Sequence, residues 1–195
     1  MTKTALGDED GDFLTGSSWF ERDYYFFKKS DLLINDSNKL GKEELLKQRK
    51  KIFLNPLGSD LENVTKNLRL FKKTSFISII KRDIDSKATL EENLSSLSSL
   101  AEICIQSALV DSMKYYAKEL SMISKVDRQK SELFIIAMGK LGGRELNASS
   151  DIDIIFFAPY KDELRKNATM LAKFERFWDK VLTRFINNLS TITDH

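Results

Sequence analysis

Apolar residues follow two different patterns along the chain. In residues 60–84, 89–123 and 162–188 they recur every three or four positions, which is the spacing of amphipathic helices. Two continuous apolar runs, Leu133–Met138 and Ile154–Phe157, lie between the last two of these segments and have the length of strands. The pattern predicts an α+β chain that is mostly helical, with the first strand buried and a second strand before the last helix.

Turn and capping residues mark the expected ends of the helices. The segment Asn55–Ser59 contains a proline and a glycine and ends the first helical region. Thr89 with Glu92 is a capping box, so a long helix is expected from residue 90 to about Ile123. A charged linker, Ser124–Ser131, then leads into the first strand. The final helix carries an apolar stripe that is expected to cover the sheet: Leu164, Leu171, Phe174, Trp178, Val181, Phe185 and Leu189.

The residues between the two strands are candidates for chemistry. They include Gly139, Gly142, Gly143, Asp151 and Asp153. The simplest interpretation is a strand, a glycine turn, a short helix and a second strand. Side chains two positions apart on a strand point to the same face, and their Cα atoms lie about 6.6 Å apart. The two carboxylates are therefore expected on one face of the second strand, with Ile152 and Ile154 toward the core.

Such a pair of carboxylates has a specific use. Like charges this close favour either a shared proton or a bound cation, and oxygen ligands favour a hard ion such as Mg²⁺ when phosphates complete its shell. Glycines without a Cβ let a phosphate approach the backbone closely. Alone, an Asp-x-Asp pair or a Gly-Gly pair is more often part of a solvated turn. Together, between two strands, they favour a metal-dependent nucleotide site, while the P-loop and dinucleotide fingerprints are absent.

Composition narrows the class of protein. The net charge of +2 argues against a dedicated nucleic-acid binder. The only cysteine, Cys104, lies in an apolar helical segment and is expected to be a buried structural thiol in a reducing cytoplasm. The only histidine is His195, so the chain has almost none of the residues that a His/Cys zinc site or histidine-based general base catalysis requires.

The N-terminal region carries no recognisable targeting signal. Residues 1–16 lack the apolar core of a signal peptide, and no apolar run has the ~20 residues of a membrane span. An aromatic cluster follows, comprising Trp19, Phe20, Tyr24, Tyr25, Phe26 and Phe27. It is compatible with base stacking, but helix packing is the favoured interpretation.

The block GKLGGRELNASSDIDIIF, from Gly139 to Phe156, resembles the signature of the bacterial glutamine synthetase adenylyltransferase and adenylyl-removing enzymes. These belong to the polymerase-β-like nucleotidyltransferases, whose general pattern is G-[GS] followed by D-x-D. The family enzyme carries two such units in tandem, and RELN-x-SSDID resembles the N-terminal unit, which removes AMP. The resemblance covers roughly residues 60–195.

The resemblance implies a fold and an activity. N-terminal helices (1–58) and a helical bundle (59–130) would lead into an incomplete nucleotidyltransferase core (131–195) at the start of a polymerase-β-like domain. The removing unit would catalyse Mg²⁺-dependent attack of inorganic phosphate on tyrosyl-AMP of glutamine synthetase, releasing ADP; the adding unit uses ATP. Glutamine synthetase, these nucleotides and a PII-type signal protein would be partners, without nucleic acid or membrane.

The resemblance also assigns roles to individual residues. Asp151 and Asp153 would be the catalytic metal ligands. Phosphate contacts would come from Gly142, Gly143, Lys140, Arg144, Ser149 and Ser150. The serines could equally bond the backbone where the chain enters the strand, and this is the favoured interpretation for one of them.

One family feature is missing from the chain. A third acid, in a segment resembling F-R-V-D-L-R-L-R-P, does not occur before His195. The isolated chain is therefore expected to be inactive. The alternative hypotheses are a non-catalytic fragment or module that binds glutamine synthetase or a signalling protein, and a polymerase-like enzyme, which the low net charge disfavours.

Overall fold

Long helices and one small hairpin make up the described part of the protein. The computed structural model describes residues 18–35, 39–53, 61–117, 119, 133–159 and 162–190. The elements in order are α1 (Ser18–Lys29), α2 (Lys42–Ile52), α3 (Leu61–Ile84), α4 (Leu90–Tyr115), β1 (Phe134–Ala137), α6 (Gly139–Gly142), β2 (Ile154–Phe157), α7 (Asp162–Arg165) and α8 (Ala168–Ser190). The prediction of a mostly helical α+β chain is confirmed.

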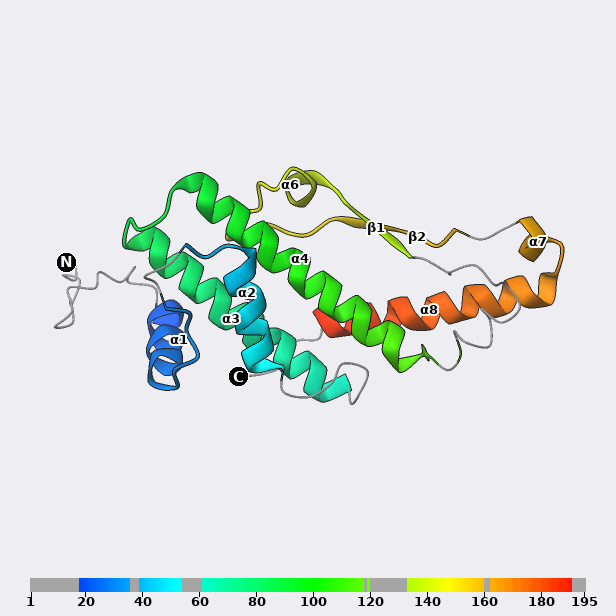
Figure 1. Ribbon diagram of the computed structural model, residues 1–195, viewed down its shortest axis with the longest axis horizontal. Coiled ribbons are helices and arrows are strands. Elements are labelled where there is room, and N and C mark those ends of the chain that lie inside the picture. Colours follow the sequence, from blue (N-terminus) through cyan, green and yellow to red (C-terminus); the bar gives the residue numbers. More distant parts are fainter. Residues whose placement is uncertain are drawn as a thin grey trace.

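The long helices α3 and α4 lie side by side and form the centre of the molecule (Figure 1). Helices α2 and α8 both pack against this pair, and the β1–β2 hairpin runs along α4 and α8 with α6 at one end (Figure 1). One core cluster joins these parts, with contributions from Leu45 of α2, Phe71 of α3, Ile103 of α4 and Phe185 of α8. Residues from all three predicted parts of the chain thus share one core, while the predicted break at 55–59 and the linker 124–131 lie outside the described residues.

Helix α4 begins where the capping pattern predicted. The Thr89 side chain accepts a hydrogen bond of 3.2 Å from the backbone N–H of Glu92. The Glu92 carboxylate pairs with Arg82 of α3 at 2.9 Å. The predicted end near Ile123 is wrong: α4 ends at Tyr115, and residues 118 and 120–132 lie outside the described part of the chain.

The N-terminal aromatic residues are used for helix packing, as predicted. Phe20, Tyr24 and Phe27 are buried against Ile77 of α3, one turn apart along α1. Trp19, Tyr25 and Phe26 lie on the exposed side of the helix. The aromatic cluster is therefore one half of an amphipathic helix.

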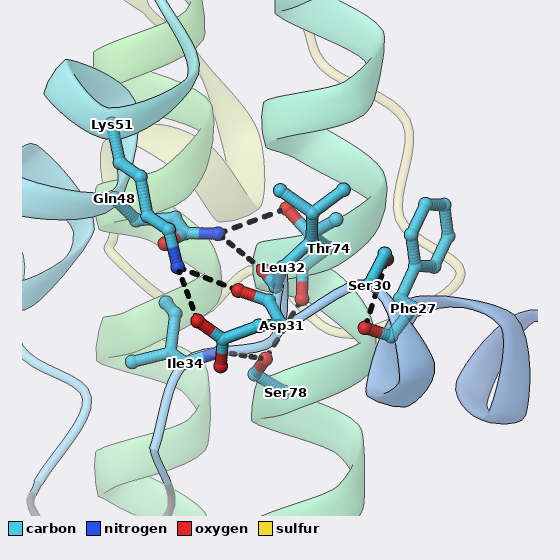
Figure 2. A network of polar contacts seen from close by, with 9 residues as sticks. All are labelled: Phe27, Ser30, Asp31, Leu32, Ile34, Gln48, Lys51, Thr74 and Ser78. Atoms are coloured by element: carbon cyan, nitrogen blue, oxygen red, sulfur yellow. Dashed lines mark hydrogen bonds and ion pairs between the residues drawn. The ribbon is translucent and has the colours of Figure 1, made fainter.

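Side chains of α2 and α3 fasten the segment that follows α1 (Figure 2). Gln48 Nε2 donates to the carbonyl of Leu32 at 2.5 Å, and Ile34 N–H donates to Ser78 Oγ at 3.0 Å. Lys51 Nζ contacts both the carbonyl, at 2.5 Å, and the carboxylate, at 3.4 Å, of Asp31. These bonds satisfy backbone groups of an irregular segment and so fix α1 on α3.

The predicted continuous helix over 162–188 is interrupted. Helix α7 ends at Arg165, and α8 begins at Ala168. Asn167 Oδ1 accepts a hydrogen bond of 3.1 Å from Met170 N–H, which is the geometry of an N-cap. The apolar stripe continues across this break, so hydrophobic spacing alone did not reveal it.

The stripe of α8 does not mainly cover the sheet, contrary to the prediction. Phe174, Phe177, Trp178 and Val181 are buried with partners that include Leu109 and Met113 of α4. The sheet is reached through Phe185, whose ring meets that of Phe156 edge to face at 5.3 Å. Helix α8 therefore packs mainly against α4 and contacts the sheet to a smaller extent.

A buried polar network joins α8 to α3 and α4. Arg184 Nε and Asn188 Nδ2 both donate to Asp111 Oδ2, at 2.8 and 3.0 Å. Thr65 Oγ1 of α3 donates to Asn188 Oδ1 at 3.3 Å. Since buried charges are stable only when they are paired and hydrogen-bonded, this network fixes how the three helices meet.

The hairpin has one covered and one exposed face. Its strands are antiparallel, with Phe134 opposite Phe157 and Ile136 opposite Ile155. Ile135, Ala137, Ile154 and Phe156 pack against the core, whereas the side chains on the other face are 44–52% exposed. The prediction of a buried first strand is therefore correct for one face only. None of the described helices is long and apolar enough to cross a membrane.

Candidate functional site

The loop between the strands is closed at its base and holds α6. Met138 N–H donates to the carbonyl of Asp153 at 2.9 Å, which extends the pairing of β1 and β2 by one step. Helix α6 follows at once, so the predicted glycine turn and the predicted short helix are the same residues. Gly139, which begins α6, has a φ of 52°, a backbone conformation that favours glycine.

Both aspartates lie immediately before β2. Asp153 enters the ladder through its backbone carbonyl, and its Oδ2 would lie 3.7 Å from a Cβ built on Gly139. The prediction that both aspartates lie on the strand is corrected, because β2 begins at Ile154. Ile152, which was expected to face the core, is 43% exposed, while Ile154 packs against the core as expected.

The two carboxylates are available to a ligand. Asp151 and Asp153 are exposed, and neither side chain forms an ion pair or hydrogen bond with another described residue. Oxygen donors without a competing cationic side chain fit a hard ion such as Mg²⁺. No cluster of three metal-ligating side chains occurs within the described ranges. The donors present therefore fit part of a magnesium shell, with water or phosphate oxygens supplying the rest.

The glycines at the end of α6 differ in what surrounds them. A Cβ on Gly142 would lie 2.6 Å from the carbonyl oxygen of Ala137, closer than real Cβ contacts. A Cβ on Gly143 would have no neighbour nearer than 3.6 Å. Gly142 therefore lets α6 pack against β1, whereas a Cβ on Gly143 would make only ordinary van der Waals contacts, with the Gly139 carbonyl oxygen and the Glu145 carboxylate.

Arg144 is directed toward α4. Its guanidinium pairs with the Glu102 carboxylate, and its Nη2 donates to Ser99 Oγ at 3.0 Å. The backbone N–H of Leu146 donates to Ser98 Oγ at 3.2 Å. These contacts anchor the loop on α4, so the charge of Arg144 is already compensated. Lys140 is exposed, and its amino group forms no ion pair with another described residue.

Ser149 and Ser150 belong to a turn organised by Asn147. Ser150 Oγ donates to Asn147 Oδ1 at 2.6 Å and accepts from Asn147 N–H at 3.1 Å. The N–H of Ser149 also donates to Asn147 Oδ1, at 3.2 Å. The Ser150 hydroxyl thus bonds the backbone, the role favoured for one of the two serines, whereas the Ser149 hydroxyl donates to the Asn147 side chain. Sequence reasoning missed Asn147 and the anchoring residues of α4, although the serines at 95–99 were a visible signal.

Comparison with known proteins supports the family resemblance of the block from Gly139 to Phe156. The family model for glutamate-ammonia ligase adenylyltransferase matches residues 26–195, which includes the whole described site.

Individual relatives carry the name bifunctional glutamine synthetase adenylyltransferase/adenylyl-removing enzyme. The protein of Ralstonia nicotianae is 34% identical over 128 residues, which are 65% of this chain and 13% of that protein. That of Hahella chejuensis is 32% identical over 147 residues, 72% of this chain and 15% of its own length. That of Chromobacterium violaceum is 40% identical over 92 residues, 47% of this chain and 10% of its own length. The match thus spans only a small part of each relative, but the family model covers most of this chain. The chain belongs to the glutamate-ammonia ligase adenylyltransferase family.

Proposed function

We propose that this chain is part of an adenylyl-removing unit that takes AMP off a tyrosine of glutamine synthetase. An oxygen of inorganic phosphate would attack the phosphorus of tyrosyl-AMP. The bond from phosphorus to the tyrosine oxygen would break, giving ADP, and the tyrosine oxygen would regain a proton. The family match, the relatives' names and the RELN-x-SSDID block support this reaction.

The observation that carries the proposal is the pair of unpaired carboxylates beside the glycine turn. Asp151 and Asp153 would hold Mg²⁺, which would supply neutralisation of charge on the phosphoryl oxygens. Gly143 carries no side chain that would keep a phosphate from the backbone, and Lys140 offers a positive charge without an ion-pair partner within the described ranges. Arg144 would act by holding the loop on α4.

The first test is binding of Mg²⁺ and ADP to the chain itself, measured by calorimetry. Asp151→Asn and Asp153→Asn should each abolish Mg²⁺-dependent ADP binding and leave the fold intact or slightly stabilised, because they relieve repulsion between like charges. The matched control is Asp179→Asn, which removes an exposed carboxylate of α8 that has no partner within the described part of the chain. Equal affinities in the wild type and both site variants would refute the metal assignment.

The second test addresses the reaction. A longer protein that contains this chain is incubated with adenylylated glutamine synthetase, phosphate and Mg²⁺, and ADP release is followed. The site variants should lose the activity and the control should keep it. Binding of glutamine synthetase without any dependence on Mg²⁺, phosphate or these aspartates would instead identify a non-catalytic binding module.

A further inference from the structure

A cavity lies between α2 and α4, and none of the residues 139–153 of the candidate site lines it. It has a volume of about 220 Å³ and is lined by Leu46, Arg49, Ile103, Gln106, Ser107 and Val110. Three of these side chains are apolar, and the other three supply a positive charge, an amide and a hydroxyl. This volume is many times the ~10–15 Å³ that a single water molecule needs, so the cavity has room for a small organic molecule.

The positive charge is held in place. Arg49 Nε donates to Ser107 Oγ at 2.6 Å, and this hydroxyl donates to the carbonyl of Ile103 at 2.7 Å. The guanidinium carbon lies 4.9 Å from the centre of the Phe53 ring. The hydroxyl fixes one edge of the guanidinium and the ring supports it, so the group is ordered without any anion.

The charge of Arg49 is not compensated by the described residues. None of their carboxylates pairs with it, and its hydrogen-bond partner Ser107 is neutral. Burial lowers the pKa of the Arg49 guanidinium, because partial desolvation penalises the charged form. An anion placed at this guanidinium would offset that desolvation.

We propose that this cavity binds a small organic monocarboxylate whose apolar part lies against Leu46, Ile103 and Val110. The Nη groups of an arginine match the two oxygens of a carboxylate. Inorganic phosphate suits the cavity less well, because it carries more charge than one guanidinium can neutralise and has no apolar part. Gln106 would supply a hydrogen bond at the rim. This inference does not depend on the proposed function.

The test uses 4-methylpentanoate as the probe and its uncharged amide as the matched ligand control. Each is titrated into the 195-residue chain, and backbone amide signals are followed by NMR. The acid should shift the signals of Gln106, Ser107 and Val110 in a saturable manner, and the amide should bind at least about tenfold more weakly, which corresponds to 1.4 kcal/mol. Absence of saturable shifts with the acid, or equal binding of both ligands, would overturn the proposal.

Variants separate the site from general effects of charge. Arg49→Met should weaken binding of the acid by about tenfold or more and leave the weak binding of the amide unchanged. Arg49→Lys should restore part of the affinity, since it returns the charge without the planar fork. Arg176→Met removes an exposed arginine of α8 and should have no effect. Arg49→Met that stays folded, by circular dichroism, and binds the acid as tightly as the wild type would exclude the site.

Discussion

The two adjacent glycines at the end of α6 provide the sharpest test of the loop's architecture. Replacing Gly142 with alanine would place a Cβ 2.6 Å from the carbonyl oxygen of Ala137, so α6 has to move away from β1. Overpacking of this kind costs about 1–3 kcal/mol. At Gly143 the nearest neighbour would be 3.6 Å away and φ is −78°, so alanine fits without strain.

Both substitutions also restrict the unfolded chain, which stabilises a protein by about 0.4–1 kcal/mol when the native backbone suits alanine. This gain is common to the two variants, so the difference between them isolates the clash at Gly142. Gly142→Ala should be less stable than Gly143→Ala by about 1–3 kcal/mol. For a protein of this size that difference corresponds to about 2–12 °C in Tm.

The assay is thermal and urea unfolding of the wild type and both variants, followed by circular dichroism. The expected order is Gly143→Ala at or above the wild type and Gly142→Ala below it. ADP affinity per folded molecule is measured in parallel with Gly143→Val, which adds a β-branched side chain to the loop and should weaken binding. Equal stability of the two alanine variants would refute the packing role of Gly142.

Three further outcomes are expected. Asp111→Ala should destabilise the protein by about 3–5 kcal/mol in urea unfolding, because it leaves the buried guanidinium of Arg184 without its carboxylate; a loss below 1 kcal/mol would contradict the role of this network. Burial raises the pKa of the Cys104 thiol from 9.0 to about 12. The unfolded chain therefore releases this proton at a lower pH than the folded protein does. The contribution of the thiol to the free energy of unfolding is complete below the pKa of the unfolded chain and declines as pH rises toward the pKa of the folded protein. The slope of unfolding free energy against pH in this window should be shallower in Cys104→Ala, and an unchanged slope would contradict the assignment. The isolated chain should show negligible ADP release from adenylylated glutamine synthetase, and turnover equal to that of a longer protein would show that the two aspartates suffice.

Local signals in the sequence predicted the elements well. Thr89 and Glu92 located the start of α4, because an N-cap depends on residues three positions apart. The two apolar runs located the strands to within two residues, because the length of a continuous run reflects the strand itself. The stripe of Phe20, Tyr24 and Phe27 was correctly assigned to packing.

Contacts between distant segments were not predictable. Arg144 was expected to contact phosphate, but its partner Glu102 is far away in sequence, and the sequence does not indicate which anion an arginine meets. Gly142 and Gly143 are identical neighbours, and only the approach of the Ala137 carbonyl distinguishes them. The break before α8 depends on the conformation of Asn167, which a continuous hydrophobic stripe conceals.

The one-sided burial of the β1–β2 hairpin has a consequence for local stability. The side chains of the pairs Phe134–Phe157 and Ile136–Ile155 are 44–52% exposed, so the two strands are held mainly by their inner face and their ladder, and the loop between them by its contacts with α4. A two-stranded ladder is marginally stable, whereas α4 lies in the main core. Amide hydrogens of the hairpin should therefore exchange with solvent through local opening, long before those of α4, which require global unfolding. A ligand held by Asp151 and Asp153 would slow hydrogen exchange in the hairpin. The exchange rate of the hairpin amides would therefore report whether the site holds a ligand.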